Sequence, residues 1–231
     1  MIIGILILLL IVVWCIEWRD ADPYTRTLEK DGYVVMDNPD AQQVLSKLPK
    51  GYQFMDYNYF IKGCSLSTFH RDVTSSGYIF NTKHPVYTFI VYDYEGPQIS
   101  LCPGSNKTVP FLWSLPRAIH GKRGTSVLFD CDVVHSGCIN TVGCKRSVRQ
   151  YKIVHVDDIP KLKSLHGVST QKIGSCNISK GYEILSRKGS LLMSYSVNHL
   201  LTPYLQKEQP GNLGKVALWL FGGRKFYNGV S

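Results

Sequence analysis

The stretch Gly124-Thr-Ser-Val-Leu-Phe-Asp-Cys-Asp-Val-Val-His135 predicts a buried β-strand that carries a histidine to its end. Valine and phenylalanine favour strands, and similar short runs bounded by turn residues recur along the chain. The candidate strands are Gly32–Met36, Gln53–Phe60, Val86–Tyr92, Ile99–Cys102, Thr125–Phe129 and Val148–Val156. The segment Asp40–Leu48 has the pattern of a short amphipathic helix. The sequence therefore predicts a mainly β fold, built as a closed or two-sheet antiparallel architecture.

Three polar side chains, His70, Asp72 and His135, have an order and spacing that suit a metal site. Side chains alternate between the faces of a strand, so His70 and Asp72 would project together while Arg71 turns away. Two imidazoles and one carboxylate that leave open positions are typical of ferrous oxygenases. Arg146 follows His135 by eleven residues and could hold a carboxylate through two parallel hydrogen bonds. The set predicts non-haem iron with a dicarboxylate co-substrate.

Two longer segments, Pro97–Asn106 and Gly124–Tyr151, resemble the phytanoyl-CoA dioxygenase-like branch of the iron(II)/2-oxoglutarate-dependent dioxygenases. The resemblance covers about residues 60 to 156. It implies a double-stranded β-helix, or jelly-roll, core with flanking short helices over residues 20–158. It also implies Fe(2+) on His70, Asp72 and His135, and 2-oxoglutarate bound through Arg146. The implied activity is hydroxylation of a substrate that the sequence does not identify.

The sequence departs from that branch at two positions. Asn106 stands where the family usually has a histidine, and Gly137 stands where a small hydroxylic residue is usual, although Ser136 is adjacent. Lys145 and Arg149 compete with Arg146 for the co-substrate carboxylate, because related hydroxylases use a cation at slightly different spacings.

The same residues bear on three other functional classes. A protein kinase is excluded, because Gly77 stands where a catalytic loop needs an asparagine. A halogenase is disfavoured, because such enzymes replace the carboxylate ligand and Asp72 is intact. The remaining alternative is a membrane-tethered β-barrel binding or structural protein with a vestigial iron site.

The first sixteen residues contain no charged side chain. Roughly 17–25 apolar residues span a bilayer, and the segment lacks the basic start and small-residue cleavage site of a signal peptide. We therefore expect an uncleaved transmembrane helix, with residues 1–19 as a membrane anchor that contacts lipid. Basic residues follow the segment and none precedes it, which favours a cytosolic domain, and the side of the membrane stays open.

Residues 159–231 form a basic extension, with ten Lys or Arg against Glu183 and Glu208. We expect it to pack on the core or on a membrane surface. Nucleic-acid binding is not expected, because arginine bias and interleaved aromatic residues are missing. The seven cysteines are odd in number and lack paired metal-ligand spacing, so free thiols are the simplest expectation.

Overall fold

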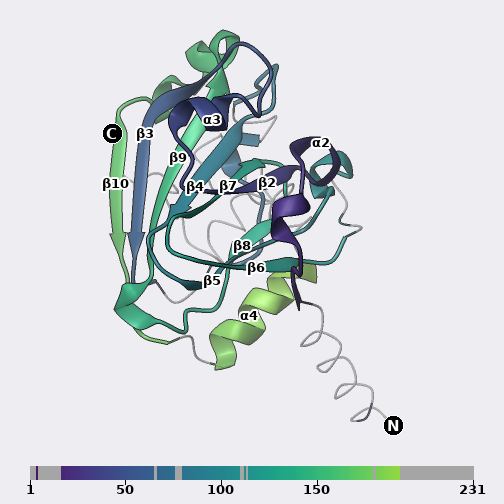
Figure 1. The fold of residues 1–231 in the computed structure, drawn as a ribbon, viewed down its shortest axis with the longest axis vertical. Helices are drawn as coiled ribbons and strands as arrows, with labels where there is room; N and C mark the ends of the chain where they lie inside the picture. Colours follow the sequence, from purple (N-terminus) through teal and green to yellow (C-terminus); the bar gives the residue numbers. More distant parts are fainter. Residues whose placement is uncertain are drawn as a thin grey trace, which may run out of the picture.

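Two β-sheets pack face to face in this protein, as the computed structural model shows (Figure 1). The structure describes residues 17–64, 67–75, 80–109, 112, 114–178 and 181–192, together with Gly4. In spatial order, the large sheet consists of β10 (Val168–Ile173), β3 (Tyr52–Lys62), β9 (Ser147–His155), β4 (Tyr87–Tyr92), β7 (Thr125–Asp130) and β2 (Tyr33–Asp37). The small sheet consists of β1 (Trp18–Arg19), β6 (Arg117–Gly121), β5 (Gly96–Leu101) and β8 (His135–Gly137).

Most neighbouring strands are antiparallel, and two edge strands are parallel to their partners. These are β1, which pairs with β6, and β10, which pairs with β3. The prediction of a mainly β fold is confirmed, with two mixed sheets in an arrangement consistent with a jelly roll.

The main hydrophobic core lies between the two sheets. Side chains from both contribute to it, because every second residue of each strand points inward. From the large sheet come residues such as Ile90 and Phe129, and from the small sheet Ile99 and Ile119. At one end of the small sheet, the first residue of β8, His135, carries a buried polar side chain.

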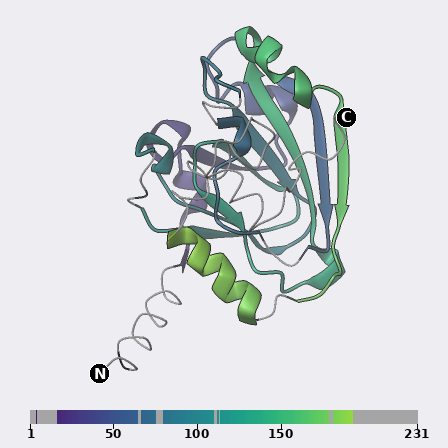
Figure 2. The same cartoon turned by 180° about the vertical axis from the view of Figure 1, so that it is seen from behind.

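Helices cover the outer faces of the sheets. The α3 helix (Ala41–Leu45) packs on the large sheet, where buried Val44 meets Phe89 and Ile153. Asp40 and Gln43 cap its start reciprocally, which satisfies two backbone N–H groups. The α4 helix (Gly181–Leu192) lies against the small sheet, as Figure 2 shows from behind. The remaining short elements are η1 (Pro23–Thr25), α2 (Leu28–Asp31), η2 (Val73–Ser75), η3 (Ser105–Lys107), η4 (Gly143–Lys145) and η5 (Val156–Leu165).

The end of the expected anchor belongs to the β domain. Trp18 and Arg19 form β1, and the Glu17 carboxylate forms an ion pair with Arg187 of α4 at 2.6 Å. The uncharged stretch before Glu17 lies outside the described residues, apart from Gly4. Among the residues that the structure does describe, no helix is long and apolar enough to cross a membrane.

The first part of the basic extension also belongs to this domain. It supplies most of η5, the edge strand β10 and the α4 helix. Residues 193–231 lie outside the described part of the chain.

Candidate metal centre

The backbone brings the two predicted histidine ligands side by side. His70 and His135 form an isolated antiparallel bridge, in which each backbone N–H donates to the other residue's carbonyl at 2.9 Å. The N–H of Asp72 donates to the carbonyl of Cys131, also at 2.9 Å. His70 and Asp72 therefore lie on one short segment that runs beside Cys131 and the start of β8.

The three side chains converge on one point. Asp72 Oδ1 lies 3.7 Å from Nε2 of His70 and 3.6 Å from Nε2 of His135. Their ligand atoms all lie within 4.8 Å of one another. His135 is buried, and His70 and Asp72 are partly buried.

Backbone carbonyls orient both imidazoles in the same way. Nδ1 of His70 lies 2.7 Å from the carbonyl oxygen of Thr68, and Nδ1 of His135 lies 2.9 Å from that of Val133. Nδ1 must carry the proton to make these bonds, so the lone pair is on Nε2, facing Asp72. Burial lowers the pKa of His135 to about 4, with His70 acting in the same direction, so this imidazole is neutral at pH 7. Neutral imidazole is the form that binds metals.

The second oxygen of the carboxylate has partners on the large sheet. Lys152 of β9 places its Nζ 2.7 Å from Asp72 Oδ2, and the hydroxyl of Thr88 in β4 donates to the same oxygen. Burial by itself raises the pKa of Asp72, but Lys152 and the two imidazoles outweigh it and hold the pKa well below its usual range. The carboxylate is therefore ionised, and two imidazoles with one carboxylate are a donor set that fits ferrous iron.

Arg146 lies on the same side of β8 as His135. It immediately precedes β9 and is 6% exposed. One guanidinium nitrogen donates to the carbonyl of Cys138, and another is so close to Gly137 that a Cβ there would overlap it. Gly137 follows His135 by two residues in the strand, which is about 7 Å along it and on the same face. A glycine at this position therefore makes room for the arginine beside the metal group.

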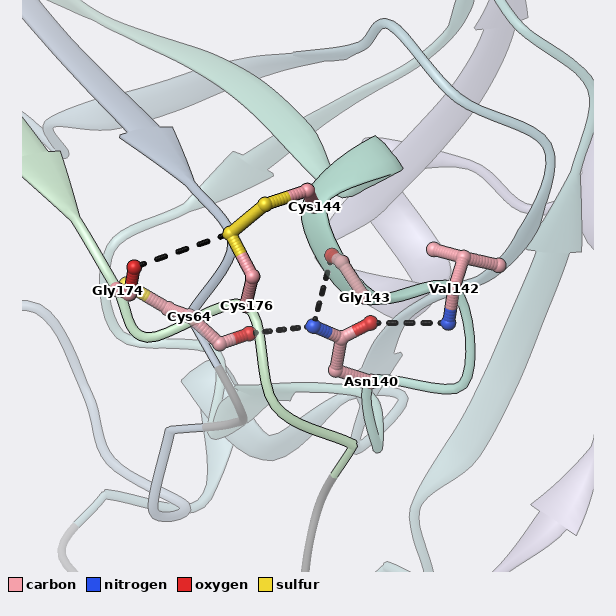
Figure 3. The surroundings of a disulfide bond; sticks show 7 residues. All are labelled: Cys64, Asn140, Val142, Gly143, Cys144, Gly174 and Cys176. Carbon is pink, nitrogen blue, oxygen red and sulfur yellow. Dashed lines mark hydrogen bonds between the residues drawn. A yellow bond between two sulfur atoms is a disulfide. The ribbon is translucent and has the colours of Figure 1, made fainter.

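A disulfide holds the segment that leads into Arg146 (Figure 3). It joins Cys144 in η4 to Cys176, which corrects the expectation of free thiols for these two residues. The Asn140 amide donates to the carbonyls of Cys64 and Gly143, closing the turn before η4 (Figure 3). Sequence spacing missed this pairing because the two cysteines meet only after β10 has packed beside β3.

The competing cations occupy different environments. Lys145 is exposed in η4, and Arg149 is an exposed residue that forms an ion pair with Asp93 at 2.7 Å. Ser136 points to the opposite face from His135, because its hydroxyl accepts a hydrogen bond from Arg187 of α4 at 2.9 Å. It therefore cannot take the place of a hydroxyl at position 137. Of the three candidate cations, Arg146 is the buried one.

A second histidine–carboxylate group, formed by His84, His155 and Asp157, lies at the other end of β9 from Arg146. Its two rings stack with centroids 3.8 Å apart. Nδ1 of His155 accepts the backbone N–H of Asp157, and Nδ1 of His84 lies 3.0 Å from the carboxylate of Asp158. In this group, protein partners already engage both Nδ1 atoms.

Two buried cations near the metal group were not predicted from the sequence. Lys152 and Arg187 are each 0% exposed. The available signal for Lys152 was its position in a strand, six residues after Arg146 and thus on the same face. Arg187 carried no such signal, because its partner Glu17 lies at the other end of the described chain.

No family model matches the sequence, and no curated protein matches it. Similar solved structures include SnoN, a non-haem α-ketoglutarate-dependent epimerase from nogalamycin biosynthesis. It has 13% identity over 69% of this chain and 95% of its own, with a TM-score of 0.42. HygX from Streptomyces hygroscopicus, with nickel and 2-oxoglutarate bound, has 11% identity over 56% and 84%, with a TM-score of 0.41.

The non-haem monooxygenase ThoJ, in a nickel complex, has 12% identity over 50% of this chain and 49% of its own, with a TM-score of 0.39. The chain thus spans about half the length of ThoJ.

Proposed function

We propose that this protein is a non-haem Fe(II)/2-oxoglutarate-dependent oxygenase that hydroxylates a substrate. The observation that carries the proposal is the convergence of His70 Nε2, His135 Nε2 and Asp72 Oδ1 on one point. The two-sheet jelly-roll arrangement and the sequence resemblance to phytanoyl-CoA dioxygenase-like proteins support the same class. His70, Asp72 and His135 would hold a ferrous iron and leave positions on it open for a co-substrate, and the iron would supply oxidation chemistry.

Arg146 is the proposed partner of the far carboxylate of 2-oxoglutarate. Its guanidinium lies beside Gly137, one pleat repeat along β8 from a metal ligand. A five-carbon dicarboxylate can therefore reach from the metal to the arginine along one face of the strand. The planar guanidinium would grip the carboxylate through two parallel hydrogen bonds.

The protein's part in the reaction is to bind, orient and exclude water. When bound, iron(II) and 2-oxoglutarate supply a reaction with dioxygen that yields succinate and carbon dioxide and hydroxylates a C–H bond. Asp72 and the two histidines hold the metal, with proton positions fixed by the carbonyls of Thr68 and Val133. The ring centroids of Phe129 and His135 lie 4.5 Å apart, so an apolar ring covers one side of the metal group.

The test combines metal binding with turnover. We expect the full-length protein in detergent to bind one Fe(II) per chain under anaerobic conditions, and to release succinate from 2-oxoglutarate when oxygen is admitted. His70→Ala should abolish both, because it removes one of three ligands. Stoichiometric iron without succinate formation would favour the alternative, a binding or structural protein with a vestigial site. A His70→Ala variant that retained full tight binding would refute the ligand set.

We also propose that residues 1–16 anchor the domain in a membrane, on the ground of their uncharged sequence. The structure sharpens the test, because a truncation must start at Glu17 to keep its ion pair with Arg187. The full chain should resist carbonate extraction, and residues 17–231 should be released. If the truncated chain stays on membranes and less of it is retained as the salt concentration rises, the remaining membrane contact belongs to the basic residues after 192.

A further inference from the structure

Lys152 is a fully buried lysine whose ammonium touches a candidate metal ligand. Its Nζ lies 2.7 Å from Asp72 Oδ2, 2.7 Å from the Thr88 hydroxyl and 3.2 Å from the Thr74 hydroxyl. The thiol of Cys131 lies at 3.4 Å. An ammonium has three protons to donate and no acceptor, so this polar nest on β4, β9 and η2 is built to hold it.

The two oxygens of the Asp72 carboxylate have different partners. Oδ1 faces both histidine Nε2 atoms, whereas Oδ2 accepts hydrogen bonds from Lys152 and from Thr88. The Thr88 hydroxyl in turn accepts a hydrogen bond from Lys152, so the two donors to Oδ2 also hold each other in place. Rotation of the carboxylate away from the histidines would break both bonds in a water-poor space.

We propose that Lys152 is a positioning residue that holds Asp72 with a single oxygen directed at the metal. The inference rests on the proposed function, since it concerns the same metal group. Hydrogen-bonded partners of ligating carboxylates orient the ligand, and their loss typically weakens metal binding by about 10–100-fold. Lys152 reaches the site from β9, two residues before the strand's inward-facing Val154.

A different role for Lys152 would predict the opposite result. If the ammonium only compensated the buried charge of Asp72, its removal would also remove a cation that repels the metal. Metal binding would then stay unchanged or become tighter. The sign of the change in metal affinity therefore separates positioning from charge compensation.

The experiment measures Co(II) affinity of the full-length protein by competition titration, with the visible cobalt spectrum as a second readout. Lys152→Met keeps an unbranched side chain of similar shape, one atom shorter, and removes the ammonium. We expect its affinity for Co(II) to fall by about tenfold or more, with an altered spectrum. Lys161→Met is the matched control, because Lys161 lies 3.8 Å from a different buried carboxylate, that of Asp158. It should bind Co(II) like the wild type.

Unchanged or tighter Co(II) binding by folded Lys152→Met overturns the proposal. If that variant does not fold, Thr88→Val decides, because it removes one bond to Oδ2 and leaves the ammonium in place. Weaker Co(II) binding by Thr88→Val supports positioning, and unchanged binding refutes it. Failure of the wild type to bind Co(II) at the triad would refute the proposed function itself, whereas a failed Lys152 inference would leave the wild type binding one equivalent.

Discussion

The two histidine–carboxylate groups of this protein have similar compositions and different geometries. In the group of His70, Asp72 and His135, backbone carbonyls accept hydrogen bonds from both Nδ1–H groups, and both Nε2 atoms face one carboxylate oxygen. In the group of His84 and His155, the rings stack, and Nδ1 atoms already have protein partners. The first geometry directs two Nε2 lone pairs at one carboxylate oxygen, whereas in the second the Nδ1 lone pair of His155 already accepts the backbone N–H of Asp157.

The surroundings of the two groups differ as well. The first group lies where the two sheets meet, with Lys152 beside its carboxylate and Arg146 on the same face of β8. The second lies near the start of η5, with Asp157 largely exposed. Residue type alone therefore does not define a site, because the orientation of lone pairs and the nearby buried cations separate the two groups.

The largest expected effect is on metal binding. His135→Ala should abolish stoichiometric Fe(II) or Co(II) binding, because it removes one of three ligands while the backbone bridge to His70 can still form. His155→Ala should keep one full equivalent, measured by metal analysis after gel filtration. The assignment of the metal to the first group is wrong if His155→Ala loses the metal and His135→Ala retains it.

The second prediction concerns the co-substrate. Loss of a buried charge-assisted pair costs about 2–5 kcal/mol. Arg146→Ala should therefore weaken 2-oxoglutarate binding by more than about tenfold. Isothermal titration of the metal-loaded protein measures this directly. Lys145→Ala and Arg149→Ala are matched controls on exposed side chains and should show much smaller shifts. A larger loss at either control would move the role to that residue.

A smaller effect is expected from Gly137→Ala. The new methyl group would overlap a guanidinium nitrogen of Arg146, and the end of a flexible side chain can move away. Co-substrate affinity should fall less than in Arg146→Ala, while the melting temperature and the affinity for metal stay near those of the wild type. Unchanged affinity for 2-oxoglutarate would show that the guanidinium position beside β8 does not matter.

The smallest effect on the proposed site is expected from Asp158→Asn. This carboxylate accepts the backbone N–H groups of Lys83 and His84 at 2.7 and 2.8 Å, and hydrogen bonds to charged groups contribute about 1.5–3 kcal/mol each. The variant should unfold at lower urea concentration yet bind metal and 2-oxoglutarate like the wild type. Impaired metal binding in the folded variant would mean that the contacts of Asp158 with His84 affect the metal group of His70, Asp72 and His135.

Much of the fold was predictable where the signal is local. The strands expected at Gly32–Met36, Gln53–Phe60 and Thr125–Phe129 correspond closely to β2, β3 and β7. Continuous β-branched and aromatic residues mark such strands without reference to the rest of the chain. The strands β1, β6, β8 and β10 were not among those expected. β1 and β8 contain only two and three residues, and β6 and β10 contain several polar or charged residues that interrupt the apolar pattern.

In the metal group, too, some features were predictable from local sequence and others depend on the tertiary structure. Strand alternation was enough to place His70 and Asp72 on one side of a segment, and the structure brings His135 to them. Burial distinguished Arg146 from Lys145 and Arg149, although its role in binding 2-oxoglutarate stays a prediction.

The sequence by itself determined the β class of the fold, the main long strands and three candidate ligands, because strand propensity and two-residue alternation act between near neighbours. Only the tertiary structure decided that Lys152 meets Asp72, that Cys144 pairs with Cys176, and that Arg187 pairs with Glu17. Each of these contacts joins residues at least 32 positions apart. Such pairs depend on sheet order and register, which packing of the whole domain sets.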